Sequence, residues 1–576
     1  MATPSTGRRR PSGRRGGLLG SPKRARNGCD GRIRLLRFLF IVFLVLVGGK
    51  AVALASSSQH LTELAQRQQL QKVELPAPRG AILDRNGAEL AVGKPQQTVY
   101  ATPYLLDDPE AAAEELCDAL QINRRRDRRD VAEKLSDAES GFAYVARKVD
   151  PVLARAALKL DLPGVGSYAE EKRTYPLKGT AAQVVGFAGM DNIGLFGIEL
   201  LYDEELSGKA GSETVVRDPA GHALKTVAHV APQPGENVYL TLDREIQFYA
   251  EDVLEETIRR ASAKAATAIV MDPRTGEVLV MANVFRQGFH GFGKDTEARK
   301  NRAVEDAPEP GSIFKLVTIS GALADGTVKP STTFSVPWKV PVADRTIEDS
   351  HVHATEEYSV REIMQESSNV GAYMIAKEME AAGLYKWVKA FGFGKKTGIE
   401  FPVESEGIVH PVEEWSGSSI GNIPMGQGVA ATAIQMASAF STVAYNGWQV
   451  KPRLVAQVGT EVHDTVEKHR VIPARVARQV RDMLRLAVEE GTGGEARIPG
   501  YDVGGKTGTA EIPLKDGSGY AKGIYTSSFI GMVPAGRPRL VVLVTVESTP
   551  GFGGVVAAPA FKDITSFALQ HLEIAP

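Results

Sequence analysis

A serine and a lysine three residues apart are the first candidates for chemistry. Ser312 and Lys315 lie in a segment of helical apolar spacing that follows Pro310 and Gly311. On a helix, a three-residue spacing places both side chains on one face, within hydrogen-bonding reach. A serine hydroxyl becomes a useful nucleophile when a nearby base takes its proton, and a buried lysine with a lowered pKa can be that base. Alone, the motif is weak, because a helix cap followed by a surface lysine has the same spacing.

Two further polar motifs follow in the chain. Ser367 and Asn369 form an S-x-N motif inside a segment of helical character. The next is a strand-like K-T-G-T flanked by small residues, which would let a substrate backbone approach closely: Lys506, Thr507, Gly508 and Thr509. A second Lys-Thr-Gly triplet, residues 396–398, lies in a charged turn and is interpreted as structural. The later copy is the better candidate, because an apolar strand is predicted nearby at 527–533.

The order of these motifs carries more information than any one of them. S-x-x-K, S-x-N and K-T-G follow one another over about 200 residues, an order that resembles penicillin-binding proteins and β-lactamases. Further segments look like class B penicillin-binding proteins: RGAILDRNGAELA from Arg79, RTYP from Arg173, GFAGMDNIGLFGIELLYDEELSG from Gly186, IPMGQG from Ile423 and SSFIGMVPAGRPRL from Ser527. The resemblance extends from about Arg79 to the C-terminus.

The resemblance implies a serine-type acyl transfer between peptidoglycan stem peptides. Ser312 would attack the carbonyl between two D-alanines, and Lys315 would take its proton. Ser367 would pass the proton to the departing D-alanine, while Asn369 would position the lysine and the substrate amide. The charge of Lys506 would help to keep Lys315 neutral. An amine from a neighbouring stem peptide would then resolve the acyl-enzyme.

The resemblance also implies how the donor peptide is held. Lys506 and the hydroxyls of Thr507 and Thr509 would bind its terminal carboxylate, with Gly508 between the two threonines. The backbone N–H groups of Ser312 and Thr509 would form the oxyanion hole, which is worth about 3 to 4 kcal/mol per donor in other acyl transferases. β-Lactams resemble the D-alanyl-D-alanine end and would acylate Ser312 without efficient release.

Other functions share parts of this pattern. A class A, bifunctional penicillin-binding protein would carry a glycosyltransferase domain, and the segment before Asn237 is too short for one. A β-lactamase would be a shorter soluble enzyme with a dedicated deacylating base, for which there is no candidate. A catalytically idle scaffold or β-lactam sensor stays open as an alternative, although the three intact motifs favour turnover.

Within class B, the sequence looks more like the septal, division-specific type than the elongation type. The features that favour the septal type are the moderate length, the absence of added C-terminal domains and the compact segment Arg173–Gly208.

The N-terminal residues predict a membrane anchor. Residues 1–37 hold eleven Lys/Arg and one acidic residue, and the apolar segment 35–55 has the length that crosses a bilayer. The positive-inside rule places residues 1–34 in the cytoplasm and the catalytic part in the periplasm or outside. The small residues at 53–55 leave a cleaved signal peptide as the alternative. A nucleic-acid-binding arm is disfavoured by the apolar segment that follows it.

The fold expected is a multidomain α/β (α+β) protein with a single N-terminal transmembrane helix. A helical stalk over 56–75 begins an elongated pedestal domain at 56–236, with a hairpin turn at Asn86-Gly87 and mainly helical residues at 105–160. By resemblance, residues 237–576 form a penicillin-binding transpeptidase domain like that of serine β-lactamases, with an antiparallel sheet flanked by helices.

Neither a cofactor nor a metal is expected. Cys29 and Cys117 fall on opposite sides of the predicted anchor and cannot pair, and His351 and His353 are interpreted as solvated or locally hydrogen-bonded. The resemblance implies a polytopic SEDS-family glycan polymerase and other division proteins as partners, beside the membrane, stem peptides and β-lactams.

Overall fold

The computed structural model describes residues 29–217, 223–288, 296–514 and 519–576. Its contacts divide the chain into two units, one made of residues 1–73 and 214–228 and the other of residues 74–213 and 229–576.

The first unit is built on a long helix, α1 (Cys29–Gln69), and a small sheet. Within the described residues, one stretch is long and apolar enough to cross a membrane, Gly31–Leu54 in α1. The predicted helical stalk is wrong beyond Gln69, because β1 (Leu70–Leu75) follows at once. The last four residues of LQKVEL, from Lys72 to Leu75, alternate polar and apolar side chains, which is the period of a strand. β1 pairs with β8 (Gly211–Arg217), which in turn pairs with β9 (Ala223–Val230).

The second unit begins with a hairpin at the predicted Asn-Gly turn. β2 (Ile82–Leu83) and β3 (Glu89–Ala101) are antiparallel, and Asp84 closes the turn by accepting the N–H groups of Asn86 and Ala88. This hairpin belongs to a seven-stranded sheet of order β19-β18-β10-β2-β3-β4, in which β5 also pairs with β3. Its other strands are β4 (Ala143–Val149), β5 (Val165–Thr174), β10 (Val238–Leu240), β18 (Val455–Val458) and β19 (Glu461–Val462).

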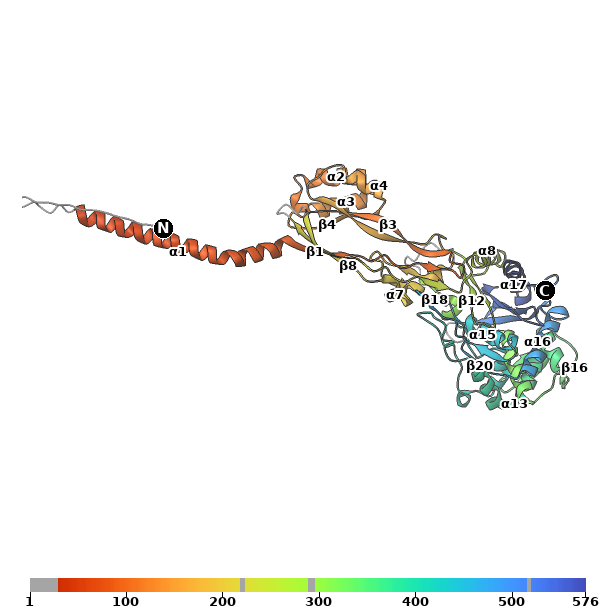
Figure 1. Ribbon diagram of the computed structural model, residues 1–576. Coiled ribbons are helices and arrows are strands. Elements are labelled where there is room, and N and C mark those ends of the chain that lie inside the picture. The colour runs from red at the N-terminus through yellow and green to blue at the C-terminus, as the bar shows by residue number, and fades with distance from the viewer. Residues whose placement is uncertain (1–28, 218–222, 289–295, 515–518) are drawn as a thin grey trace, which may run out of the picture. The chain divides into compact units, whose positions relative to one another are not determined.

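Three helices cover one end of this sheet and enclose a separate apolar core. They are α2 (Pro109–Ala119), α3 (Arg125–Leu135) and α4 (Pro151–Leu158) (Figure 1). α2 and α4 begin at an aspartate followed by a proline, and the carboxylates of Asp108 and Asp150 accept backbone N–H groups of the first turn. The prediction that 105–160 is mainly helical is confirmed, apart from β4.

A buried charge cluster fixes the segment that joins the sheet to the rest of the unit. Glu199, fully buried, accepts from Nε of Arg79 at 2.8 Å and from Nε of Arg173 at 2.6 Å. Arg79 also pairs with Asp203 at 2.7 Å. The segment contains α5 (Ala182–Val185), β6 (Phe187–Ala188), β7 (Gly194–Phe196), α6 (Gly197–Leu201) and α7 (Asp203–Ser207). The cluster explains why the RGAILD and GIELL segments both carry charges beside apolar residues.

A five-stranded antiparallel sheet organises the C-terminal part, in the order β12-β11-β23-β22-β21. Its strands are β11 (Ala265–Met271), β12 (Val278–Phe285), β21 (Gly504–Pro513), β22 (Tyr520–Val533) and β23 (Leu540–Thr549). Their central residues are buried on both faces, which fits near-continuous apolar runs such as AATAIVM. The strand predicted at 527–533 is confirmed by β22.

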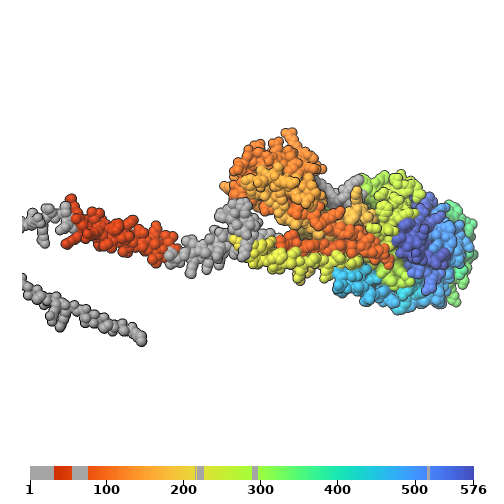
Figure 2. Space-filling view, turned by 45° about the horizontal axis from the view of Figure 1, so that its top comes forward, coloured from red at the N-terminus to blue at the C-terminus, as the bar shows by residue number. Residues whose placement is uncertain are grey.

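Helices cover both faces of this sheet, as Figure 1 shows. One face packs against α8 (Arg244–Ala261) and α17 (Gly553–His571), which also contact each other (Figure 2). The other packs against α15 (Ala433–Ala444) and α16 (Ala474–Glu489), behind which lie α11 (Lys315–Asp325) and α13 (Asn369–Ala390). The predicted α/β class, with an antiparallel sheet between helices, is confirmed.

Short elements complete the chain. The helices are α9 (Thr296–Arg299), α10 (Arg302–Glu305), α12 (Val360–Glu366) and α14 (Ser419–Asn422). The strands form pairs β13 (Thr333–Val336) with β16 (Glu356–Ser359), β14 (Lys339–Val342) with β15 (Arg345–Glu348), and β17 (Trp448–Val450) with β20 (Lys468–Arg470).

Candidate active site

The first motif lies where a 3-10 turn passes into a helix. Gly311–Phe314 forms the turn η2, and α11 begins at Lys315. Nζ of Lys315 lies 3.0 Å from Oγ of Ser312, so the predicted contact across a three-residue spacing is present. Lys315 is fully buried, whereas Ser312 is partly exposed. The hydroxyl is therefore open to a substrate while the amine beneath it is shielded from water.

The second motif interrupts a helix, which corrects the prediction that it lies inside one. α12 ends at Glu366, Ser367 takes a left-handed conformation with φ 62°, and Ser368 caps α13 by accepting the N–H of Gly371. The left-handed conformation is strained for a serine, and such backbone strain is common at functional sites. The break turns the backbone of Ser367 toward the first motif.

Both residues of the S-x-N motif reach the buried lysine. Nζ of Lys315 lies 2.5 Å from the carbonyl oxygen of Ser367, 3.3 Å from its hydroxyl and 2.7 Å from Oδ1 of Asn369. Together with Ser312, these contacts surround the amine with four oxygens. The structure thus brings the four predicted catalytic residues together around one nitrogen.

The environment of Lys315 favours a neutral amine. Burial lowers its pKa well below the ordinary value, and the charge of Lys506 lowers it further, against a smaller opposing effect of Asp349. A neutral amine has two N–H groups and one lone pair. It can donate to the carbonyl of Ser367 and to Asn369 while its lone pair accepts the proton of Ser312. The site can therefore activate a serine nucleophile.

The third motif lies on the edge strand of the sheet. Lys506 is fully buried in β21, and burial lowers its pKa to about 7. The hydroxyl of Thr507 lies 3.0 Å from that of Thr492, and Oγ1 of Thr509 accepts the N–H of Gly553 at 3.1 Å. A cation and hydroxyl groups beside an edge strand can bind the carboxylate end of an extended peptide.

Gly508 allows the first and third motifs to meet. A Cβ atom added at Gly508 would lie 3.1 Å from the carbonyl oxygen of Pro310 and 3.1 Å from Cγ2 of Ile313. A side chain there would push η2, and with it Ser312, away from β21. The glycine of K-T-G is therefore needed for close approach rather than for a special backbone angle.

Asp349 is a site residue that the sequence analysis missed. It follows β15 and accepts the hydroxyl of Ser368 at 2.8 Å and the backbone N–H groups of Asn369, at 2.5 Å, and Val370, at 3.0 Å. His353 contacts the same carboxylate at 3.1 Å, which raises the pKa of the histidine. Asp349 thus anchors the start of α13. A single aspartate in a loop gives no spacing signal, so its role is visible only in three dimensions.

The second Lys-Thr-Gly triplet has a different environment. The N–H groups of Thr397 and Gly398 donate to Glu404, as does the hydroxyl of Thr397, so the triplet closes a local turn. This placement agrees with its interpretation as structural. Among the described residues, no group of three or more His, Cys, Asp or Glu side chains is arranged to hold a metal ion.

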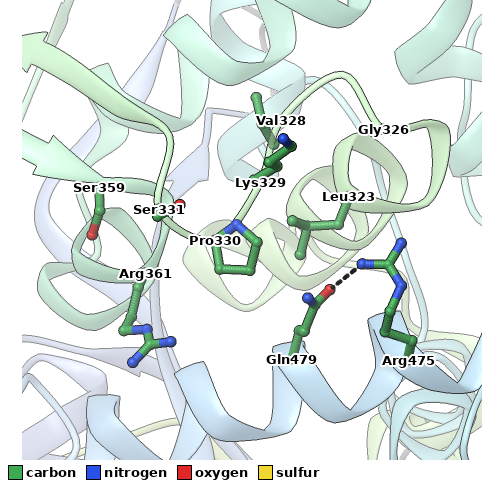
Figure 3. Close-up of a pocket in the computed structure, with 10 residues that line it drawn as sticks. All are labelled: Leu323, Gly326, Val328, Lys329, Pro330, Ser331, Ser359, Arg361, Arg475 and Gln479. Atoms are coloured by element: carbon green, nitrogen blue, oxygen red, sulfur yellow. Dashed lines mark hydrogen bonds between the residues drawn. The ribbon is translucent and has the colours of Figure 1, made fainter.

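A separate cavity of about 700 Å³ lies at the other end of α11 from Ser312 (Figure 3). Its lining includes Leu323 and three exposed cations, Lys329, Arg361 and Arg475. In Figure 3 the three cationic side chains point in different directions rather than toward one centre. None of the eight predicted site residues lines this cavity.

Comparisons with known proteins agree with this architecture. Residues 266–566 match the family described as penicillin binding protein transpeptidase domain, and residues 74–240 match the penicillin-binding protein dimerisation domain. The chain is 33% identical over 542 residues to penicillin-binding protein PbpB of Mycolicibacterium smegmatis, covering 86% of this chain and 83% of that protein. It is 29% identical to peptidoglycan D,D-transpeptidase FtsI of Escherichia coli, covering 93% and 91% of the two chains.

A solved structure is similar over the same region. The crystal structure of penicillin binding protein 3 from Mycobacterium tuberculosis, complexed with aztreonam, aligns with a TM-score of 0.68 and 28% identity, covering 87% of this chain and 98% of that chain. Two matched domains, relatives at about one-third identity over most of the chain and the shared fold all point to one family. The chain belongs to the class B penicillin-binding proteins and is a peptidoglycan D,D-transpeptidase.

Proposed function

We propose that this enzyme works through an acyl-enzyme on Ser312 and that it cross-links stem peptides at the division septum. The observation that carries the mechanism is the position of Lys315. Its buried amine, with a lowered pKa, lies 3.0 Å from the hydroxyl of Ser312 and is held by Ser367 and Asn369. A nucleophile with an adjacent base, itself oriented by other groups, is the arrangement that acyl transfer requires.

The first step is attack of Ser312 Oγ on the carbonyl between the two D-alanines of a donor peptide. The proton of Ser312 passes to Nζ of Lys315, and the C–O bond of a tetrahedral intermediate forms. The N–H of Ser312, in the first turn of η2, and the N–H of Thr509 would donate to the developing oxyanion. When the C–N bond breaks, the proton reaches the leaving nitrogen through the hydroxyl of Ser367, 3.3 Å from Nζ.

The second step reverses the first with a different amine. The acceptor amine of a neighbouring stem peptide enters where the D-alanine left, gives a proton to the neutral Lys315 through Ser367, and attacks the ester carbonyl. Collapse of the intermediate returns the proton to Oγ of Ser312. The new amide cross-links the two peptides, and the enzyme is unchanged.

The donor carboxylate is proposed to bind at β21. A carboxylate beside Lys506 would raise the pKa of that lysine above about 7 and keep it charged in the complex. The hydroxyls of Thr507 and Thr509 lie on the same face of the strand, two residues apart, and can donate to the same carboxylate. The similar structure complexed with aztreonam supports β-lactam binding by this chain.

The membrane arrangement is also proposed. Gly31–Leu54 would cross the membrane once, with the basic residues before it in the cytoplasm and the second unit in the periplasm or outside. The segment Arg173–Gly208, which resembles septal enzymes, supports a role in division beside a SEDS-family polymerase and other division proteins.

Two experiments test this function. Purified full-length protein in detergent, given lipid-linked glycan strands and a glycan polymerase, should release D-alanine and form cross-linked dimers that penicillin abolishes.

The second experiment is done in cells. Depletion of the protein from the native cell should produce filaments whose septa are blocked, and a fluorescent fusion of the protein should lie at midcell. Rounded cells and lateral-wall fluorescence would instead indicate the elongation type. Absence of both D-alanine release and penicillin binding would indicate an idle scaffold.

A further inference from the structure

Another cavity lies where the second Lys-Thr-Gly triplet meets the β17–β20 pair. Its volume is about 470 Å³, within the range of small-molecule sites. Three parts of the chain line it: the loop after α13, the first turns of α15, and the strands β17 and β20 with residues that flank them. The lining contains none of the eight predicted site residues. This cavity is therefore a separate place on the transpeptidase domain.

The rim of this cavity is rich in lysine. Four lysines line it: Lys395, Lys396, Lys451 and Lys468. Lys451 is half-buried, and the other three are exposed. Among the described residues of the lining, Glu467 is the only acidic one, and its carboxylate lies 3.1 Å from Nζ of Lys451. No described carboxylate lies within salt-bridge distance of the other three lysines. The rim therefore keeps positive charges that no acidic side chain neutralises.

Direct contacts hold the lysine-bearing segments together. The carbonyl oxygen of Lys395 accepts Nε2 of Gln435, on α15, at 2.9 Å. The N–H of Lys451 donates to the carbonyl oxygen of Glu467 at 3.0 Å, which joins the end of β17 to the start of β20. A Cβ atom added at Gly398 would lie 3.3 Å from Cε of Lys451, so this lysine crosses the second triplet. The charges of the rim therefore act on one shared volume.

A buried amide faces the same cavity. Gln449, in β17, is 7% exposed, and its Nε2 donates to the carbonyl oxygen of Phe391 at 2.9 Å. Its Oε1 accepts no hydrogen bond from another described residue. A Cβ atom added at Gly392 would lie 3.6 Å from this oxygen and 3.6 Å from Cε of Lys395, so the amide and the lysine lie over the same glycine. Since a buried acceptor without a donor is costly, this oxygen is suited to a donor on a ligand.

The kind of cation on the rim indicates the kind of anion. A lysine ammonium is a compact charge with three donors, and several of them can approach a tetrahedral phosphate from different sides. A planar carboxylate is matched best by the fork of an arginine, and no arginine lines this cavity among the described residues. The lysines therefore favour a phosphate, and the free Oε1 of Gln449 favours a ligand that also carries a hydroxyl group.

We propose that this cavity binds a phosphate ester that carries a neighbouring hydroxyl group. Lys395, Lys396 and Lys468 hold the phosphate, and Oε1 of Gln449 accepts the hydroxyl. Esters of this kind occur as small solutes and as the repeating unit of phosphodiester polymers. Both sources present the same chemistry to the cavity, so a polymer and its monomer are compared directly.

The test is a calorimetric titration of the full-length protein in detergent, at low ionic strength, with four probes. They are glycerol phosphate, methyl phosphate, citrate and poly(glycerol phosphate). We expect glycerol phosphate to bind, and methyl phosphate, which lacks the hydroxyl, and citrate, which lacks the phosphate, to bind about threefold to fivefold more weakly. A lower Kd per phosphate for the polymer than for glycerol phosphate would assign the polymer as the source, and an equal or higher Kd would assign the small ester.

Single charges of the rim are then changed by substitutions that keep a polar side chain. Lys395→Gln and Lys468→Gln should each raise the Kd of glycerol phosphate about fivefold, because each removes one exposed cation. Glu467→Gln removes the acidic residue of the lining and should lower the Kd about threefold, a gain that a folding defect does not produce. Lys377→Gln, an exposed lysine of α13 outside the cavity, is the matched control and should keep the wild-type Kd.

Other outcomes would overturn the proposal. Absence of binding up to about 10 mM glycerol phosphate would exclude the site, as would an unchanged Kd in either lysine variant, a Kd that does not fall in Glu467→Gln, or an altered Kd in Lys377→Gln. Citrate that binds as tightly as glycerol phosphate would contradict the choice of phosphate. Methyl phosphate that binds as tightly would contradict the role of Gln449. None of these titrations depends on acyl transfer at Ser312.

Discussion

At the scale of single residues, the site depends on two lysines that the fold keeps out of water. Lys315 and Lys506 are both fully buried, and burial lowers the pKa of each. Burying an ammonium is costly, and two near each other cost more. Their roles differ: Lys315 has to lose its charge to act as a base, whereas Lys506 has to keep its charge to bind a carboxylate. The two requirements together limit the pH range of the enzyme.

This opposition predicts a bell-shaped pH profile. Acylation by a D-alanyl-D-alanine donor should fall at acid pH, as Lys315 becomes protonated and cannot accept the proton of Ser312. It should also fall as pH rises above about 7, because free Lys506 loses its charge. The measurement is kcat/KM for D-alanine release between pH 5 and 10. Lys506→Arg, which stays charged, should move the alkaline limb upward; a limb unchanged in that variant would contradict the assignment.

At the scale of elements, a helix break and a hairpin place the second motif. Ser367 reaches Lys315 because α12 and α13 are separated by a left-handed residue. Asp349 then fixes the start of α13 by accepting two of its first N–H groups, which have no partner within the helix. The site is thus held by loop geometry between regular elements.

Asp349→Asn should weaken catalysis more than it weakens folding. The amide can accept fewer of the N–H groups and loses the pair with His353, so Asn369 would lose its fixed position beside Lys315. We expect kcat/KM for acylation to fall about tenfold to a hundredfold, with about 1 to 3 kcal/mol lost from the free energy of unfolding. Glu357→Gln, an exposed residue of β16, is the control. Wild-type acylation by Asp349→Asn would show that the anchor is dispensable.

The buried cluster around Glu199 gives a second prediction at this scale. Glu199→Gln would leave Arg79 and Arg173 as buried cations with only Asp203 nearby. We expect a loss of about 3 kcal/mol in the free energy of unfolding, seen as a lower thermal midpoint by calorimetry. Glu204→Gln, on the exposed side of α7, should leave the midpoint unchanged. Equal midpoints for the two variants would show that the cluster is not structural.

Much of the element pattern follows from local sequence, and the failures have local causes. The apolar run at 527–533 predicts β22, and Asn86-Gly87 predicts the first hairpin. The predicted stalk is too long, because the helix-forming residues before Leu70 outweigh the short two-residue alternation of KVEL. The eight site residues were predicted through motif order. Asp349 and the break at Ser367 were not, since neither a lone loop aspartate nor a strained serine has a spacing signature.

At the scale of the whole molecule, a helix long and apolar enough to cross a membrane precedes a peptidoglycan D,D-transpeptidase. The proposed orientation predicts that protease added to intact spheroplasts will digest the second unit. The part of the chain before Gly31 should stay protected until the membrane is dissolved. An epitope tag at each end of the chain, detected by immunoblotting, distinguishes the digested C-terminal part from the protected N-terminal part. Protection of the C-terminal tag in sealed spheroplasts would contradict the orientation, and release of an intact C-terminal part without protease would indicate a cleaved signal peptide.

The central claim is that Ser312 forms the acyl-enzyme, and one measurement tests it directly. Full-length protein in detergent is treated with a fluorescent penicillin, digested, and read by peptide mass spectrometry, in wild type and in Ser312→Ala. The account predicts one acyl group per chain, on the peptide that contains Ser312, and none in Ser312→Ala, whose thermal midpoint should match the wild type. A label on another residue, or a label that persists in the variant, would contradict it.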